Sequence, residues 1–231
     1  MIRKVWEGKP VEFKLIKQTS DPLYEAALNL YDNYQFGNVR QQHHVFKQSL
    51  ENKRTKNDYV FIVGLDNDEV VSLATAHYEA TTNSAFIIYL VAIDTPEREQ
   101  YLTDTLAQVQ NELDHLAERV HNREVNFFMM EALPLPESTE EKDADLLFKR
   151  HRFLNDHGFE EQTEIDYKRP GLDKEMPPIA LNLFLHTRIP LTKDIYATSV
   201  KSCYILKYVF ANHLSRKRVY PLLEEMDLRK S

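Results

Sequence analysis

Three polar residues in otherwise apolar stretches are the first candidates for chemistry. Glu131 ends "NFFMME", His77 lies in "ATAHYEA" and Tyr89 lies in "AFIIYLVAI". A carboxylate or a histidine near a reacting group takes up a proton as a general base, and a tyrosine hydroxyl orients a substrate. Each residue also has a structural explanation. Glu131 could cap a turn or pair with a lysine, His77 could be a half-buried strand histidine, and Tyr89 could be a core tyrosine with a satisfied hydroxyl.

The stretch "VAIDTPEREQYLTDTLAQVQNEL" (91–113) predicts a junction between a strand and a helix. The amides at such a helix start bind phosphate groups, and Arg98 would add a cation. The turn contains no glycine, although glycine is what lets a backbone approach a phosphate closely. A structural interpretation fits the same residues, with Thr95 as the N-cap and Pro96 at the first helical position. Both interpretations remain open at this point.

Other motif classes give weaker signals. Tyr34 and Phe36 in "NYQFGN" are aromatic residues beside a glycine, which favours either a substrate wall or ordinary loop packing. His43 and His44 are adjacent in sequence and would point to different faces of a helix, so no metal site is expected. Phosphate-binding glycine loops and nucleophile elbows are missing from the sequence.

The spacing of apolar residues predicts a mixed α/β domain, written also as α+β. Period-two and continuous apolar runs predict strands, whereas three- and four-residue spacing predicts helices. Strands are expected over 11–18, 59–66, 69–80, 84–94, 124–133, 160–170 and 178–187, and helices over 20–35, 39–52, 96–120 and 145–159.

Composition limits the class of protein. The chain has 231 residues, a formal charge of −7 and a single cysteine, Cys203. The acidic balance disfavours nucleic-acid binding, which normally needs a basic surface. One cysteine forms no internal disulfide, which is typical of a reducing compartment. The longest apolar run, 85–93, is far shorter than the roughly 20 residues that span a bilayer. We therefore expect a cytoplasmic protein that binds no membrane.

The order of these elements resembles the GNAT superfamily of acyl-CoA-dependent N-acyltransferases. "AFIIYLVAIDTPERE" is similar to the family's fourth strand and the entry to its central helix, and "FKRHRFLNDHGFEEQ" is similar to its late helix. The resemblance covers residues 11–187. It implies a mostly antiparallel central sheet flanked by helices, acetyl-CoA as the acyl donor, and an amine-bearing acceptor that attacks directly in a ternary complex.

The resemblance also implies roles for particular residues. The backbone of Val91 and Ile93 would pair with the pantetheine arm of the cofactor. Arg98 matches the first position of the family's pyrophosphate signature, while Thr103 stands where the family has a small residue. Glu131 is the first choice for the base, with Tyr89 and His77 as further catalytic candidates.

Three positions depart from the family pattern. The turn lacks its glycines, Leu154 replaces a tyrosine that protonates the leaving thiolate, and Leu147 replaces an asparagine that contacts the cofactor. An alternative is therefore a GNAT-fold binding or assembly module that does not use CoA productively.

Residues 190–231 do not continue the succession of strands and helices expected over 1–189. The spacing of their apolar residues predicts a helical C-terminal extension. Its stretch 195–214 carries a broad apolar face. We expect this face to cover the domain's own sheet, with a homodimer seam as the alternative.

Overall fold

The computed structural model describes residues 11–34, 42–52, 59–136, 144–173 and 175–229. Its centre is a seven-stranded sheet in the order β1-β2-β3-β4-β5-β9-β6. These strands are β1 (Glu12–Leu15), β2 (Tyr59–Asp66), β3 (Glu69–Glu79), β4 (Ser84–Ala92), β5 (Phe127–Ala132), β6 (Glu160–Gln162) and β9 (Asn182–Thr187). All neighbours are antiparallel except β4 and β5, which run parallel. The expected mixed, mostly antiparallel sheet is confirmed.

Two helices cover one face of the sheet. They are α3 (Arg98–His121) and α4 (Ala144–Asp156). The buried face of α3 presents Leu106, Val109 and Leu113 to strand residues such as Ile87 and Met130. Leu154 of α4 is fully buried in the same cluster, so its side chain is a core side chain.

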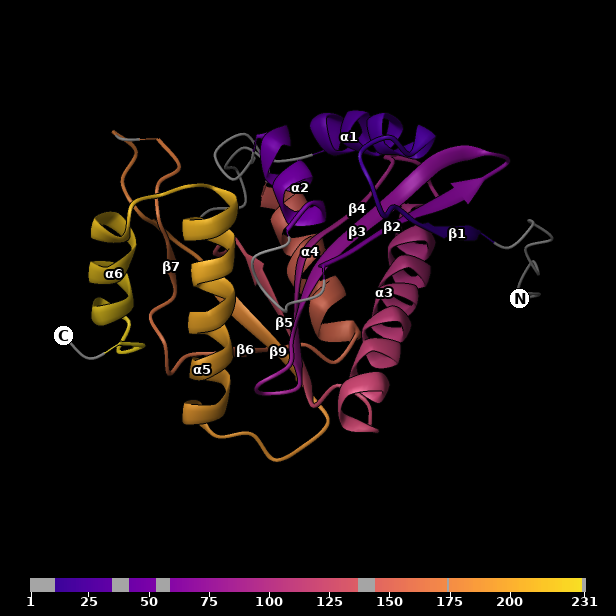
Figure 1. The fold of residues 1–231 in the computed structure, drawn as a ribbon. Coiled ribbons are helices and arrows are strands. Elements are labelled where there is room, and N and C mark those ends of the chain that lie inside the picture. Colours follow the sequence, from indigo (N-terminus) through magenta and orange to yellow (C-terminus); the bar gives the residue numbers. More distant parts are fainter. Residues whose placement is uncertain (1–10, 35–41, 53–58, 137–143, 174, 230–231) are drawn as a thin grey trace.

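The opposite face is covered in two parts. Over β2 to β4 lie α1 (Pro22–Tyr34) and α2 (His43–Leu50), and over β5 and β9 lies the C-terminal extension. The extension consists of α5 (Lys193–Tyr204), a π-helical segment η2 (Ile205–Ala211) and α6 (Arg216–Glu225). Figure 1 shows α5 and α6 on the side of the sheet opposite α3, with the chain around β7 drawn between the two helices.

The extension shares a hydrophobic core with the sheet. Val200, Tyr204 and Tyr208 pack in one cluster with Phe127 and Met129 of β5. This contact confirms that the apolar face of the extension covers the chain's own sheet. Dimerisation through the extension stays a prediction.

β4 and β5 pair only at their beginnings. The parallel register joins Ser84, Ala85 and Phe86 to residues 127–129 and stops there. Two residues later, β4 carries a bulge, because Thr75 faces Tyr89 while Ala76 faces Ile87, which leaves Ile88 without an opposite residue. The two strands then diverge, and a space opens between their carboxyl ends.

Some element boundaries differ from expectation. The stretch 160–170 is not one strand but β6 followed by a loop and β7 (Lys168–Arg169). β7 pairs with β8 (Ile179–Ala180) in a separate two-stranded sheet. Within the described residues, no helix combines the length and apolar character needed to cross a membrane.

Candidate active site

A cavity of about 480 Å³ lies between the diverging ends of β4 and β5. Its walls come from β4 (88–91), the start of α3, the end of β5 and α4. Leu147, which sequence comparison placed at a cofactor-contacting position, is one of its lining residues. The cavity therefore lies where the two parallel strands of the sheet separate, which leaves room for a ligand.

The start of α3 is open rather than capped. The helix begins at Arg98, and Glu97, the residue before it, makes no side-chain cap. Thr95, the N-cap of the structural interpretation, does not cap this helix: its hydroxyl has no partner within the described residues, and its carbonyl accepts from the Arg98 amide at 3.0 Å in a tight turn. The amides of Glu99 and Gln100 donate to no backbone carbonyl among the described residues. Two donors at the positive end of a 24-residue helix are thus available to an anion.

Two buried polar atoms beside this helix start also lack partners within the described part of the chain. They are the Thr95 hydroxyl and Nε of Arg98, and both residues line the cavity. A buried polar group without a partner costs free energy unless a ligand or water satisfies it. These atoms and the open amides form a cradle that fits an anionic group such as a diphosphate.

Basic side chains outnumber acidic ones in the cavity lining. The basic residues are Arg98, Lys149, Arg150, Arg152 and Arg169, and the acidic residues are Asp94, Glu99, Glu131 and Asp145.

Three of the acidic residues already have a basic partner within the lining. Asp145 pairs with Lys149 at 2.6 Å, and the looser pairs Asp94–Arg98 and Glu99–Arg152 span 3.6 and 3.9 Å. The fourth, Glu131, is paired with a residue from outside the lining, as described below.

Arg150 has no such counterion. No carboxylate among the described residues lies within ion-pair distance of its guanidinium, which donates to the Leu90 carbonyl at a long 3.4 Å. Burial of this group, followed by the charge of nearby Arg98, lowers the pKa of Arg150 to about 10. Arg98 and Arg150 therefore both line the cavity near the open helix start and repel each other, and an anion bound there would offset this repulsion.

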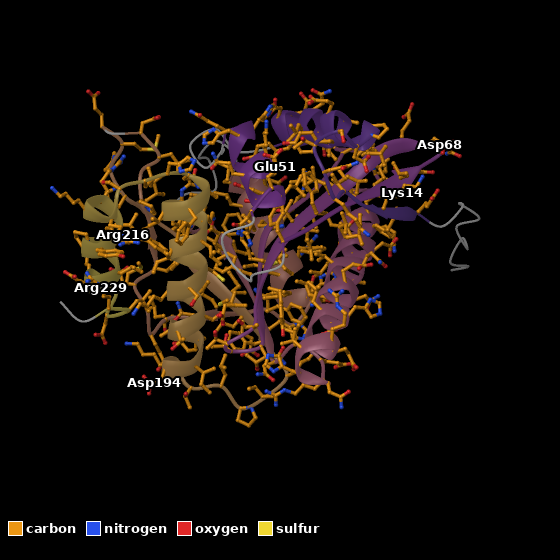
Figure 2. All side chains as sticks on the ribbon, viewed as in Figure 1. Lys14, Glu51, Asp68, Asp194, Arg216 and Arg229 are labelled. Atoms are coloured by element: carbon orange, nitrogen blue, oxygen red, sulfur yellow. The ribbon has the colours of Figure 1, made fainter. Side chains whose placement is uncertain are left out.

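Glu131 lies at the other end of the cavity and is firmly held. Its Oε1 accepts from Nζ of Lys207 at 2.5 Å, and its Oε2 accepts from the Tyr167 hydroxyl at 3.0 Å. The side chains of Glu131 and Lys207 are only 11% and 6% exposed. Charged residues labelled in Figure 2, such as Asp68 and Arg229, lie instead at the periphery of the molecule.

The charge state of Glu131 follows from these neighbours. Burial alone would raise the pKa of this carboxyl group, but the positive charges of Lys207 and Arg169, with the two hydrogen bonds, hold its pKa below the ordinary value. Burial lowers the pKa of Lys207 and outweighs the attraction of Glu131. We conclude that Glu131 lines the cavity as an ionised, fixed carboxylate.

The other two catalytic candidates lie in different surroundings. Tyr89 lines the cavity and packs against Tyr31 and Phe46, with ring centroids 4.9 and 5.4 Å away. Burial, and then Tyr31, raises its pKa well above the ordinary value, so its hydroxyl stays neutral.

His77 does not line this cavity. It faces a separate space of about 10 Å³ together with Cys203 and Lys207. Burial, with Lys207 adding, lowers the pKa of His77 to about 4. The structure thus separates His77 from Glu131 and Tyr89.

The backbone groups of Val91 and Ile93, the two strand residues expected to contact the cofactor, face β3 instead of the cavity. The Ile93 amide donates to the Val71 carbonyl at 2.9 Å, so it points toward β3 and away from the cavity. Val91 lines the cavity and is paired with Leu73 of β3. The carbonyl that faces the open edge is that of Leu90, which contacts Arg150. The alternation of a strand places the free edge one residue away from the expected positions.

Thr103 is turned away from the cavity. Its hydroxyl donates to the Glu99 carbonyl at 2.9 Å and lies 3.1 Å from Nε2 of His157. Tyr34 is the last residue of α1, but its side chain and the whole of Phe36 lie outside the described residues.

Sequence reasoning missed Arg150, Arg169 and Lys207. A signal for Arg150 was present, because "KRHR" (149–152) places three cations on a helix that follows a buried strand. Lys207 carried no local signal, since its partner Glu131 is 76 residues away.

Comparison of the sequence with known proteins assigns this chain to no family. No protein family model matches the chain. A curated relative, the RNA-directed RNA polymerase L of Mammarenavirus lassaense, is 25% identical over 129 residues. That match covers 56% of this chain, and the chain spans about 5% of the length of the polymerase.

Solved structures of GNAT acetyltransferases superpose over most of the chain. A protein of Bacteroides thetaiotaomicron assigned to this family has a TM-score of 0.56 at 15% identity and covers 87% of this chain and 98% of its own. The ribosomal-protein-S18-alanine N-acetyltransferase of Escherichia coli has a TM-score of 0.51 at 12% identity, with 79% and 97% covered. A GNAT acetyltransferase of Staphylococcus aureus has a TM-score of 0.50 at 10% identity, with 76% and 99% covered. The diverging β4 and β5, the open start of α3 and these superpositions agree: this chain has the GNAT fold.

Proposed function

We propose that the protein is an N-acyltransferase that binds an acyl-CoA, most simply acetyl-CoA, between β4 and β5 and transfers the acyl group to an amine. The observation that carries this proposal is the open start of α3, where the Thr95 hydroxyl, Nε of Arg98 and two amides lack partners within the described residues. A helix capped by Thr95 would instead have favoured the alternative, a module that does not use CoA.

The residues of the cradle would hold the diphosphate of the cofactor. Arg98 and Arg150 would supply charge-assisted hydrogen bonds from two sides, in place of the glycine loop that the sequence lacks. The open edge of β4 at Leu90 would pair with the pantetheine amides once Arg150 moves from the Leu90 carbonyl to the diphosphate. When bound, the cofactor supplies an acyl group activated as a thioester.

The chain's own residues at the far end would receive the acceptor. A fixed, ionised Glu131 would attract an ammonium group and accept its proton, directly or through a water molecule. The apolar walls formed by Ile88 and Leu181 would limit access of water to the thioester. Tyr89, with a neutral hydroxyl, would orient the acceptor.

The proposal includes a cytoplasmic location and an amine acceptor of unspecified structure. Cys203 is buried and forms no disulfide, as in a reducing compartment. Burial, and then Glu79, raises the pKa of the Cys203 thiol to about 12, so this cysteine is no nucleophile.

Calorimetric titration with acetyl-CoA and CoA tests the binding step. We expect a dissociation constant of about 1–10 μM, corresponding to roughly 7–8 kcal/mol. Arg98→Glu should abolish binding by reversing the charge of the cradle, whereas Arg119→Glu, an exposed position near the other end of α3, should leave it unchanged. Absence of binding by the wild-type protein at millimolar ligand would refute the proposal. Release of free CoA thiol in the presence of a panel of amines then tests transfer.

A further inference from the structure

The C-terminal extension contacts the cavity wall through Lys207, whose ammonium group pairs with the Glu131 carboxylate. Lys207 lies in η2, where the Asn212 amide donates to the Lys207 carbonyl five residues back, at 3.1 Å. Wide turns of this type are uncommon and occur frequently at functional sites. Nζ of Lys207 lies 5.8 Å from the ring centroid of Phe86 and 5.2 Å from that of Tyr208. The ammonium group is therefore confined between two rings and the carboxylate of Glu131.

Glu131 faces the extension because of strand alternation. Phe128 and Met130 of β5 point to the α3 side, while Phe127 and Met129 point to the extension. Glu131 shares the direction of Phe127 and Met129. Among the described residues, the titratable or charged groups that act on it come from this side or from the cavity wall: Lys207, Tyr204 and Tyr208 from the extension, Tyr167 and Arg169 from around β7, and Tyr89 from β4.

We propose that Lys207 is a positioning residue of the acyltransferase site, which keeps the Glu131 carboxylate ionised and fixed in the cavity wall where the acceptor amine is received. This inference rests on the proposed function. It makes the C-terminal extension part of the active site as well as a cover for the sheet.

The physical reason is the cost of a buried charge. An isolated carboxylate in a desolvated site takes up a proton instead of remaining charged. A protonated Glu131 would neither attract an ammonium group nor accept its proton. Lys207 engages one oxygen and Tyr167 the other, and each carboxylate oxygen keeps a further lone pair for a ligand.

The experiment compares Lys207→Gln with Lys207→Arg. Lys207→Gln removes the charge and retains a hydrogen-bond donor, whereas Lys207→Arg retains the charge. Lys201→Gln is the matched control, because Lys201 lies in α5 and does not line either cavity. Two quantities are measured: the pH profile of kcat/KM, and the titration of the Glu131 side-chain carbon by nuclear magnetic resonance, assigned with Glu131→Gln.

The proposal predicts that, in Lys207→Gln, the acidic limb of the kcat/KM profile and the titration of Glu131 both move to higher pH. The pKa of Glu131 and the acidic limb of kcat/KM should rise together by about 1–3 pH units, the usual effect of removing an opposite charge at this distance. Lys207→Arg and Lys201→Gln should keep the wild-type limb. In a Glu131→Gln background, Lys207→Gln should cause no further shift, since Lys207 acts through Glu131.

Other results would overturn the proposal. An unchanged limb in a folded Lys207→Gln variant would do so, as would an equal loss of rate at every pH that Lys207→Arg does not rescue. If Lys207→Gln fails to fold, Lys207→Arg decides: the wild-type limb supports the proposal and a shifted limb refutes it. A wild-type protein that binds no acyl-CoA would refute the proposed function and the positioning role with it. The resonance titration would then still show whether Lys207 keeps Glu131 ionised.

Discussion

The two ends of the cavity differ in how their polar groups are satisfied. At the α3 end, the Thr95 hydroxyl, Nε of Arg98 and two amides have no partner within the described residues. At the β5 end, both oxygens of Glu131 are engaged, by Lys207 and by Tyr167. The first end comes from a single stretch of chain with one arginine from α4. The second is assembled from β5, the extension and the segment before β7.

This difference indicates that the two ends of the cavity have different functions. Unpartnered donors near cations suit a ligand that brings its own negative charge, because the ligand completes their hydrogen bonds. A carboxylate held by one partner at each oxygen suits a group whose charge and direction must be set before a substrate arrives. Three of the predictions that follow weaken one end and leave the other intact, and one concerns His77, which lies outside the cavity.

The largest effect is expected for Glu131→Gln. This change leaves Lys207 buried without its carboxylate, and breaking a buried pair typically costs about 3–5 kcal/mol. Urea denaturation measures the free energy of unfolding. Glu224→Gln, which breaks the partly exposed pair with Arg229, is the control and should cost less than about 1 kcal/mol. An equally small loss for both variants would contradict a firmly held β5 end.

The next effect is a dependence of stability on pH that originates at His77. The pKa of His77 is lowered from 6.5 to about 4 in the folded protein, so the unfolded chain binds this proton first as the pH falls. The free energy of unfolding should therefore decrease between pH 6.5 and 4, by up to about 3 kcal/mol.

The variant His77→Phe should lose this decrease, whereas His115→Phe, at an exposed position of α3, should keep it. Urea denaturation at several pH values measures the difference. The Glu131 contribution lies in a separate window. Because its folded pKa is lowered, its stabilisation is present above the ordinary value of 4.5 and is lost as the pH falls through the folded pKa. A slope that is identical in wild type and His77→Phe would refute a buried neutral histidine.

A smaller effect, on the open end alone, is expected for Arg150→Gln. Loss of one charge-assisted contact should weaken acetyl-CoA binding about tenfold, corresponding to roughly 1.4 kcal/mol. The unfolding free energy should change little, because Arg150 makes one long hydrogen bond to the Leu90 carbonyl. Calorimetry measures the affinity, with Arg119→Gln as the control. Unchanged affinity would remove Arg150 from the cradle.

The smallest effect is expected for Tyr167→Phe. Glu131 keeps Lys207 in this variant and loses one hydrogen bond, so the free energy of unfolding should fall by about 1 kcal/mol. Urea denaturation measures the change. A loss as large as that of Glu131→Gln would assign to Tyr167 the role that we assign to Lys207.

The fold was largely predictable because its signals are local. The apolar run 85–93 became β4, and the repeated leucines after Pro96 became α3. The boundaries of the helices and strands were less predictable. Thr95 to Arg98 form a tight turn, so α3 starts two residues later than Pro96, and the stretch 160–170 bends where its alternation is weak.

The site was only partly predictable. Glu131 and Arg98 stand beside strong strand and helix patterns, and both line the cavity. Lys207 and Arg169 act on Glu131 through contacts between distant segments, which no spacing in the sequence reveals. For Ile93 and Thr103, one step along a strand or a helix decides whether a group faces the cavity, and the bulge at Ile88 changes that alternation.

Hydrogen exchange at the start of α3 tests the central claim most directly. In the free protein, the amides of Glu99 and Gln100 should exchange rapidly, because no carbonyl of the described residues accepts from them. Addition of acetyl-CoA should slow exchange at these two amides, while the β5 amides that are hydrogen-bonded to β9 stay as they are. Unchanged exchange at Glu99 and Gln100 under saturating acetyl-CoA would contradict an anion site at this end of the cavity.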